Sequence, residues 1–277
     1  MADRMHDQLR EKRERLCDRL REMGSVAVGY SGGVDSTTLL AIAHEVLGAQ
    51  AIGMTVRSGW MSSQDAEETE RFCAERGIRH EDLSITAEDV PGFADNPKDR
   101  CYLCKRAEFG LMVTRARQLG LACVADGSNV DDEGDYRPGL RAIGELGVVS
   151  PLREAGITKQ DVRALAPDMG ITVWDKPASA CLSSRIAYGE KITLEKLRRI
   201  DEAEEYLRSL GLRQVRVRIH GRKGEVARIE VPTVDLALFA DERTREQVAA
   251  RMHEVGFTYV SLDLDGFRSG SGNAVLK

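Results

Sequence analysis

The stretch Ser25-Val-Ala-Val-Gly-Tyr-Ser-Gly-Gly-Val-Asp-Ser36 decides the fold, because an apolar run ends in a glycine pair and the chain continues as a helix-like run over 37–47. Glycine permits a tight turn and lets the backbone approach an anion closely. The free N–H groups at the start of the following helix point toward such an anion, and the helix dipole favours its charge. The stretch therefore predicts a strand, a turn that binds a nucleotide phosphate, and a helix, with Asp35 able to hold Mg²⁺.

The pattern Ser-Gly-Gly-x-Asp-Ser at 31–36 differs from two common nucleotide loops. It has neither the lysine of the Walker A loop nor the spaced glycines of a Rossmann loop. It resembles the PP-loop of enzymes that activate an oxygen atom as an adenylate and split ATP into AMP and pyrophosphate. The alternative is a Gly-Gly turn followed by a Ser or Asp helix cap without a ligand.

Strand-like and helix-like runs alternate after this loop, at 51–56, 65–76, 78–85, 101–119 and 121–125. This alternation predicts an α/β fold with a doubly wound parallel sheet, which binds ligands beyond the C-terminal ends of its strands. With the PP-loop resemblance, it implies a PP-loop ATP pyrophosphatase domain over 1–172, with an adenine nucleotide alpha hydrolase-like fold.

The remaining residues, 173–277, are expected to form a second, smaller α+β domain. Its expected helices are 194–210 and 244–255, and its expected strands are 215–219, 225–231 and 259–264.

Polar residues follow or end three of the predicted parallel strands, and we expect them to converge on one crevice that binds ATP and Mg²⁺. The complete set of predicted nucleotide-binding residues is Gly29, Ser31, Gly32, Gly33, Asp35, Ser36, Arg57, Asp126 and Asn129. For 126–129 the alternative is an ordinary Asp-Gly turn.

Composition restricts the class of partner. The chain has 277 residues, with 40 Lys and Arg against 45 Asp and Glu, so its net charge is −5. This balance argues against a broad nucleic-acid surface and favours a small-molecule substrate. No stretch approaches the roughly 20 apolar residues of a membrane span, and the charged N-terminus does not resemble a signal peptide. We therefore expect a cytoplasmic protein, in which six cysteines favour metal binding or sulfur chemistry over disulfides.

Two of the cysteines, Cys101 and Cys104, form a Cys-x-x-Cys pair at the start of a predicted helix, beside Arg100 and Lys105. The pattern suits zinc, an iron–sulfur cluster or a redox dithiol, because the helix N-terminus and the basic neighbours favour thiolate. Cys181 is the third candidate ligand. The other cysteines, Cys17, Cys73 and Cys123, are interpreted as small core or surface residues.

Five segments together resemble the LarE-type ATP-dependent sulfur transferases, and the resemblance covers nearly the whole length. They are Tyr30–Ser36, Arg100-Cys-Tyr-Leu-Cys-Lys105, Ala125-Asp-Gly-Ser-Asn129, Asp135-Tyr-Arg-Pro-Gly139 and Cys181-Leu-Ser-Ser-Arg185. The resemblance implies that ATP adenylates the carboxylates of pyridinium-3,5-biscarboxylic acid mononucleotide, which then become thiocarboxylates. The product is a precursor of the nickel-pincer nucleotide cofactor.

The resemblance also implies one of two sulfur sources. In one group of the family three cysteines hold a 4Fe-4S cluster that passes on sulfide, and Cys101, Cys104 and Cys181 match that group. In the other group a single cysteine, matched by Cys181, gives up its own sulfur and becomes dehydroalanine.

Further roles follow from the same resemblance. The implied catalytic residues are Cys181, Asp35, Arg185 and Glu204, and the implied substrate-binding residues are Arg137, Ser184, Arg185, Arg216 and Asp235. For Glu204 the alternative is a solvated helix face, and for Arg216 and its strand neighbour Arg218 it is plain solvent exposure. The family also suggests a homo-oligomer, a hexamer of two trimers.

Two other functions compete with this interpretation. A PP-loop tRNA thiolase would adenylate an oxygen in the same way, but it should present an extensive basic face. A nucleotide-binding regulator without catalysis would leave the cysteine triad and the arginines unexplained, and it would release neither AMP nor pyrophosphate.

Overall fold

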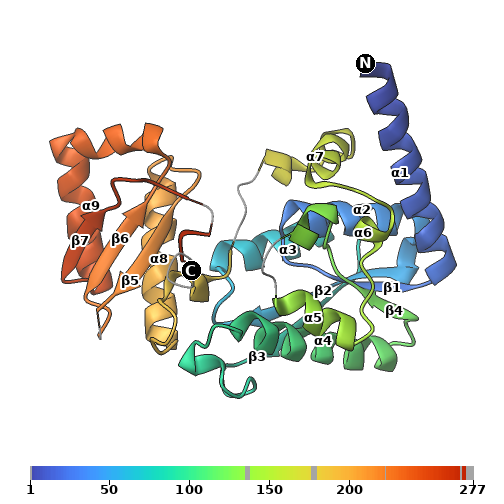
Figure 1. Cartoon of the computed structure of the whole chain (residues 1–277), viewed down its shortest axis with the longest axis horizontal. Coiled ribbons are helices and arrows are strands. Elements are labelled where there is room, and N and C mark those ends of the chain that lie inside the picture. The colour runs from blue at the N-terminus through green and yellow to red at the C-terminus, as the bar shows by residue number, and fades with distance from the viewer. Residues whose placement is uncertain (1, 135–137, 176–179, 222, 269, 273–277) are drawn as a thin grey trace. The chain divides into compact units, whose positions relative to one another are not determined.

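The computed structural model describes residues 2–134, 138–175, 180–221, 223–268 and 270–272, and the chain separates into two compact units (Figure 1). Unit 1 consists of residues 1–58, 65–90 and 99–179, and unit 2 consists of residues 59–64, 91–98 and 180–277. Two short segments from the first half of the chain thus belong to the second unit. The boundary between 172 and 173 stays a prediction.

A parallel sheet forms the centre of unit 1. Its strands are β1 (Val26–Gly29), β2 (Ala51–Ser58), β3 (His80–Ile85) and β4 (Cys123–Ala125), in the order β3-β2-β1-β4. Val26, Ala27 and Val28 are each 0% exposed, as expected for a strand covered on both faces. The predicted α/β class with a parallel sheet is confirmed.

Helices cover both faces of this sheet (Figure 1). One face carries α1 (Ala2–Met23), α2 (Val34–Leu47), α3 (Ser63–Arg76), α6 (Pro151–Glu154) and α7 (Lys159–Asp168), and the other carries α4 (Arg100–Gln118) and α5 (Pro138–Glu145). Because the chain runs outward from β1 to β3 and then returns to β4 on the other side of β1, the topological switch point lies between β1 and β4.

A small mixed sheet forms the centre of unit 2. Strand β5 (Arg216–His220) is antiparallel to β6 (Val226–Glu230), which is parallel to β7 (Tyr259–Leu262). The two long helices of the unit are α8 (Leu194–Ser209) and α9 (Glu242–Val255). Val217 and Ile219 alternate with the arginines of β5 and are 0% exposed, so this strand buries its apolar face in the core.

The two early segments of unit 2 are held by specific contacts. The rings of Trp60 and Phe93 are 4.4 Å apart, and both side chains are buried. The carbonyl of Trp60 accepts a hydrogen bond from the Leu182 N–H at 2.9 Å. These contacts anchor the segment that begins at Cys181. Among the described residues, no helix is both long and apolar enough to cross a membrane.

Candidate functional site

The turn between β1 and α2 has the form that the sequence predicts. Gly32 has a φ of +73°, a left-handed conformation that glycine adopts without strain. Gly33 is the N-cap of α2, and no side chain caps the helix there, so the alternative of a Ser or Asp cap is wrong. The Ser31 N–H donates to Ser36 Oγ at 3.3 Å, which closes the loop on itself. The uncapped N–H groups at the start of α2 suit an anion.

The loop after β4 lies directly against this turn. A Cβ added to Gly127 would lie 2.9 Å from the backbone nitrogen of Ser36, so only glycine fits there. Asp126 is 5% exposed, and its carboxylate accepts hydrogen bonds from Ser150 Oγ at 2.6 Å and from Ser128 Oγ. The expected approach of the β1 and β4 loops is confirmed, and it occurs at the switch point.

Asp35, in the first turn of α2, has two partners from distant parts of unit 1. Asn129 Nδ2 donates to Asp35 Oδ1 at 3.3 Å, and Lys159 Nζ forms an ion pair with the same carboxylate. Sequence reasoning did not single out Lys159. The pattern Thr158-x-x-Asp161, which forms a capping box at the start of α7, is a signal that marks this helix start.

Two other predicted nucleotide-binding residues have partners of their own. Arg57 is the penultimate residue of β2. Its guanidinium donates to both oxygens of Asp82 at 2.9 and 3.0 Å. Gly29 ends β1, and a Cβ there would lie 3.0 Å from the Phe109 ring of α4. Close packing of β1 against α4 thus explains this glycine, and a role of either residue in nucleotide binding stays a prediction.

Cys101 and Cys104 occupy the first turn of α4. Their i, i+3 spacing places them on one side of the helix. Cys101 is exposed and Cys104 is buried, with the Cys104 thiol donating to Glu108 Oε1 at 3.2 Å. Burial by itself lowers the pKa of Lys105, but the nearby Glu108 carboxylate, 3.3 Å from its ammonium, together with Cys104 and Asp126 outweighs burial, so that the pKa of Lys105 is raised.

The other cysteines are consistent with packing roles. Burial raises the pKa of the Cys73 thiol to about 12 and also raises those of Cys17 and Cys123. Within the part of the chain that the structure describes, no group of three or more His, Cys, Asp or Glu side chains is arranged to hold a metal ion. Cys101 and Cys104 belong to unit 1 and Cys181 to unit 2.

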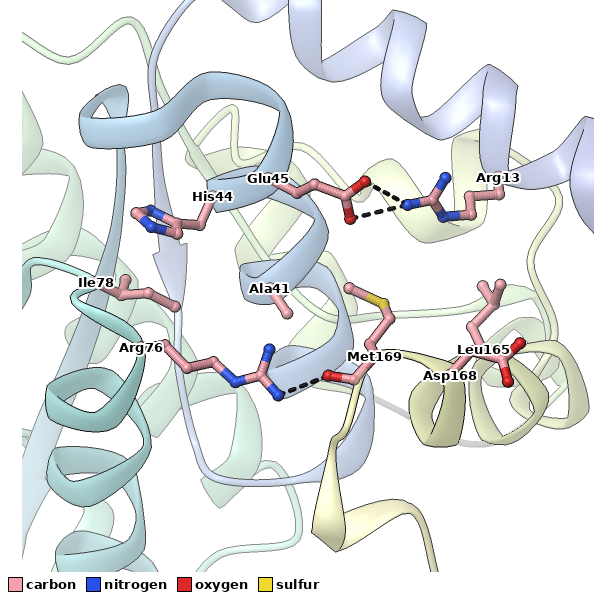
Figure 2. A pocket seen from close by; sticks show the side chains of 9 residues that line it. All are labelled: Arg13, Ala41, His44, Glu45, Arg76, Ile78, Leu165, Asp168 and Met169. Carbon is pink, nitrogen blue, oxygen red and sulfur yellow. Dashed lines mark hydrogen bonds and ion pairs between the residues drawn. The ribbon is translucent and has the colours of Figure 1, made fainter.

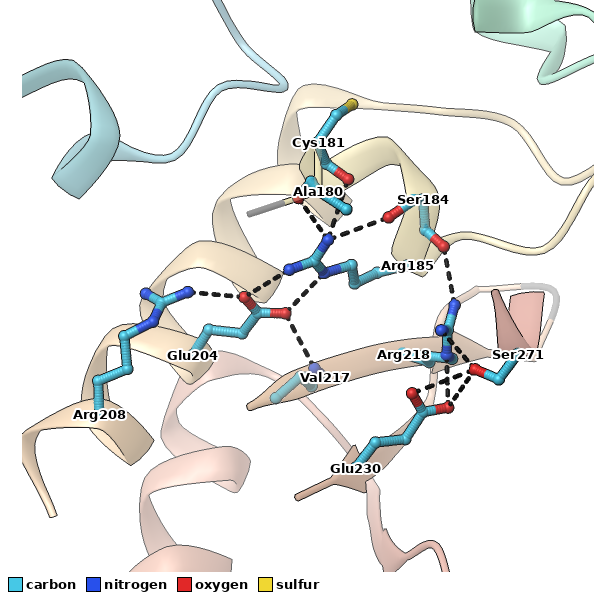
Figure 3. Close-up of polar contacts among 10 residues, drawn as sticks. All are labelled: Ala180, Cys181, Ser184, Arg185, Glu204, Arg208, Val217, Arg218, Glu230 and Ser271. Carbon is cyan, nitrogen blue, oxygen red and sulfur yellow. Dashed lines mark hydrogen bonds and ion pairs between the residues drawn. The ribbon is translucent and has the colours of Figure 1, made fainter. Parts of the chain in front are cut away.

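Cys181 lies in unit 2 at the start of the short helix η5 (Leu182–Arg185), and it is exposed. The Arg185 side chain holds its backbone: Nη1 donates to the Cys181 carbonyl at 3.2 Å and to Ser184 Oγ at 3.0 Å (Figure 3). Arg185 is only 4% exposed. The cysteine is therefore presented to solvent by a backbone that a buried guanidinium fixes.

Glu204 of α8 is the counter-ion of Arg185. It is 0% exposed, and its oxygens accept from Arg185 at 2.8 and 3.1 Å (Figure 3). Arg208 and the backbone N–H of Val217 donate to it as well, at 2.8 and 3.0 Å. The alternative of a solvated Glu204 is wrong, because this carboxylate joins η5, α8 and β5 inside the unit.

Strand β5 carries two buried arginines with different surroundings. Arg218 pairs with Glu230 at 2.5 Å and donates to the Ser184 carbonyl at 2.9 Å (Figure 3). Arg216 is 8% exposed. Its guanidinium lies over the Phe267 ring at 4.6 Å and makes no hydrogen bond or ion pair with another described residue. Burial, together with the charges of Arg185 and Arg218, lowers the pKa of Arg216 to about 10.

The solvent-exposed alternative is thus wrong for both arginines, and Arg216 is a buried cation without a carboxylate partner among the described residues. Asp235 lies in η6 (Thr233–Ala240), and its side chain is partly buried. Arg137, also predicted to bind substrate, lies outside the described residues.

A cavity of about 660 Å³ opens in unit 1 among α1, α2 and α7 (Figure 2). None of the predicted site residues lines it. Its arginines are engaged, because Arg13 donates to Glu45 at 2.7 Å and Arg76 donates to the Met169 carbonyl at 2.6 Å. The cavity is therefore separate from the phosphate-binding turn.

A parallel sheet with the pattern Ser-Gly-Gly-x-Asp-Ser in the turn at its switch point is typical of the PP-loop class of ATP-dependent enzymes. The family profile described as NAD synthase matches residues 9–108, which include this turn. The class implies ATP and Mg²⁺ as ligands, and Asp35 offers the carboxylate oxygens that Mg²⁺ prefers.

Curated relatives extend the similarity to both units. A pyridinium-3,5-bisthiocarboxylic acid mononucleotide synthase of Lactiplantibacillus plantarum is 37% identical over 97% of this chain and 96% of its own. An uncharacterised protein of Synechocystis is 41% identical over 97% and 99%. A tRNA-specific 2-thiouridylase of Rippkaea orientalis is 30% identical over 62% of this chain and 58% of its own. The chain belongs to the LarE family and is an ATP-dependent sulfur transferase.

Proposed function

We propose that the protein adenylates the carboxylates of pyridinium-3,5-biscarboxylic acid mononucleotide and converts them into thiocarboxylates. The observation that carries this proposal is the 37% identity, over 97% of the chain, to the synthase named for the corresponding bisthiocarboxylic acid. The similarity is not confined to the ATP-binding unit, since it also spans the segment 181–185 and strand β5 of unit 2.

The chemistry begins with a carboxylate, which is a poor electrophile. One of its oxygens attacks the α-phosphorus of ATP, the bond to the bridging oxygen breaks, and pyrophosphate leaves with the electron pair. A sulfur nucleophile then attacks the carbonyl carbon of the acyl-adenylate, and AMP leaves. The turn at 31–36 contributes by holding the phosphates, and Asp35 by holding Mg²⁺, so the protein supplies position and charge neutralisation.

Arg216 is the best-supported contact for the substrate. A buried cation without a counter-ion is costly, and a carboxylate or phosphate of the mononucleotide would remove that cost through two parallel hydrogen bonds. Arg185 and Arg218 already have buried carboxylate partners, so we assign them to positioning Cys181 and Ser184. Asp235 and Arg137 are proposed as further substrate contacts from the family resemblance alone.

For the sulfur source we propose a 4Fe-4S cluster held by Cys101, Cys104 and Cys181. Three thiolate ligands leave one iron of such a cluster free to carry sulfide. The support for this proposal is the family resemblance and the local setting of the cysteines: Cys101 and Cys104 lie at a helix N-terminus that favours thiolate, and Cys181 is exposed. The described residues themselves hold no preassembled group of three such ligands. If no cluster is bound, the sulfur of Cys181 itself becomes the donor. A cytoplasmic homo-oligomer, with a hexamer as the family's form, is part of this proposal.

Iron and acid-labile sulfide content of protein purified without oxygen tests this assignment. We expect about four irons per chain and broad absorption at roughly 400 nm. Both should be lost in Cys101→Ala and kept in Cys123→Ala, which removes a partly buried thiol of β4. Protein that stays free of iron after anaerobic reconstitution, and loses the mass of H₂S from residue 181 in turnover, would overturn the cluster in favour of the sacrificial cysteine.

The substrate is tested separately, by incubating the loaded protein with ATP and either the mononucleotide or bulk tRNA. Release of AMP and pyrophosphate with formation of a thiocarboxylate is expected only with the mononucleotide. Thiolation of tRNA instead would overturn the proposed substrate, and release of no AMP with either would favour the regulator.

A further inference from the structure

The phosphate-binding turn of unit 1 offers hydrogen-bond donors but has no cation of its own. Residues 31–36 contain serine, glycine, Val34 and the acidic Asp35. The triphosphate of ATP adds several negative charges to that of Asp35. Enzymes of phosphoryl and nucleotidyl transfer balance such charge with Mg²⁺ and with lysine or arginine. A basic side chain that balances this charge would have to reach the turn from another part of the chain.

Lys159 meets this need. Its Nζ is paired with the Asp35 carboxylate, although 124 residues separate the two in sequence. The side chains are 33% and 22% exposed, so solvent, and hence a ligand, reaches them. Lys105 is close enough to Asp126 for the two charges to interact, but its ammonium pairs with Glu108 of its own helix, whereas Lys159 pairs with a residue of the turn itself.

The backbone around Lys159 is fixed in a way that aims the side chain at the turn. The Lys159 N–H donates to Asp131 Oδ2 at 2.8 Å, and the Asp131 N–H donates to Asn129 Oδ1 at 2.9 Å. Asn129 Nδ2 in turn donates to Asp35. One short network thus directs both an amide and an ammonium group at the same carboxylate.

We propose that Lys159 is a phosphate-binding residue of the ATP site, held by Asp35 until the nucleotide binds. Mg²⁺ that arrives with ATP takes Asp35 as a ligand, and the Lys159 ammonium turns to the β- and γ-phosphate oxygens. The same contact stabilises pyrophosphate as charge builds up on it when the bond to the α-phosphorus breaks. This inference rests on the ATP dependence of the family, and it is independent of the sulfur acceptor and the sulfur source.

Lys159→Met removes the ammonium and keeps most of the aliphatic stem. Calorimetry with Mg²⁺ would measure its affinity for α,β-methylene ATP, for pyrophosphate and for AMP. We expect the first two affinities to fall roughly 10- to 100-fold, and the affinity for AMP, which lacks the β- and γ-phosphates, to stay unchanged. Lys159→Arg should keep most of the affinity for the ATP analogue.

Lys12→Met is the matched control. Lys12 of α1 forms an ion pair at 2.5 Å with Asp161, which lies in the same first turn of α7 as Lys159. It should leave all three affinities unchanged, whatever it does to the melting temperature. Equal weakening of all three ligands in Lys159→Met, no weakening of any, or the same pattern in Lys12→Met would each overturn the proposal.

A second pair of variants decides the matter if Lys159→Met does not fold. Asp35→Asn releases Lys159 from its partner, so the affinity for pyrophosphate without Mg²⁺ should rise. The rise should disappear in Asp35→Asn combined with Lys159→Met, which has no cation at position 159 and no unpaired Asp35 carboxylate, and it should remain in Asp35→Asn combined with Lys159→Arg. A rise of the same size in Asp35→Asn combined with Lys159→Met would overturn the assignment.

Discussion

The candidate sites of the two units depend on different kinds of interaction. In unit 1 the proposed phosphate-binding turn consists of consecutive residues, 31–36, which offer backbone N–H groups and small side chains to an anion. In unit 2 the segment that presents Cys181 is held by ion pairs between residues that are distant in sequence, above all Arg185 with Glu204. The first site depends on backbone conformation, and the second depends on buried charge. Substitutions should therefore damage them in different ways.

The largest expected effect is a division of the reaction between the units. Asp35→Ala should reduce pyrophosphate release at least roughly 100-fold, since it removes charge control at the phosphates. Cys181→Ala should abolish thiocarboxylate formation and leave pyrophosphate release close to that of the wild type. The measurement is both products from one incubation with ATP and the mononucleotide. Equal loss of pyrophosphate release in the two variants would contradict the division.

Stability should be most sensitive to the buried carboxylate of unit 2. Glu204→Ala leaves Arg185 buried without its counter-ion, which should lower the free energy of unfolding by about 3–5 kcal/mol. Denaturant unfolding measures this change. Glu205→Ala, on the exposed side of the same helix, should change it by less than about 0.5 kcal/mol. Similar losses of unfolding free energy in both variants would show that the buried ion pair contributes no more to stability than an exposed side chain does.

Arg216→Met should change substrate affinity and protein stability in opposite directions. We expect substrate affinity to fall roughly 10- to 100-fold, because a charge-assisted pair of hydrogen bonds is lost. The ligand-free protein should melt higher. Burial lowers the pKa of Arg216 to about 10, so the folded state disfavours the charged form. That cost is fully present at neutral pH and falls only as the pH rises through about 10.

Calorimetry with the mononucleotide and a thermal scan without it check both parts of this prediction. Arg213→Met, at an exposed position just before β5, is the control and should keep wild-type substrate affinity. A lower melting temperature together with unchanged affinity in Arg216→Met would reverse the assignment of Arg216.

The smallest expected effect concerns backbone shape in unit 1. Gly127→Ala would place a methyl group 2.9 Å from the Ser36 nitrogen, so the start of α2 must shift and affinity for an ATP analogue should fall by about tenfold. Gly110→Ala has open space around the added carbon and should instead stabilise α4 by about 0.5–1 kcal/mol. Analogue binding that Gly127→Ala leaves intact would show that the turn tolerates movement.

Much of unit 1 could be predicted because its signals are local. The apolar run before Tyr30 predicts a buried strand, and the glycines after it predict the turn and the helix start. Lys159 could not be found in this way, because no residue near it in the sequence indicates with which distant carboxylate it forms an ion pair. The same limit applies to the segments around Trp60 and Phe93, whose membership of unit 2 depends on long-range packing.

The sequence by itself determined the alternation of strands and helices, the phosphate-binding turn and the family of this protein. These depend on side-chain periodicity and on short motifs, which act over a few residues. Only the tertiary structure decided that Glu204 and Arg216 are buried and that Arg216, unlike Arg185, has no carboxylate partner among the described residues. Burial and charge pairing depend on which residues pack against a side chain. In this fold those residues come from distant parts of the chain.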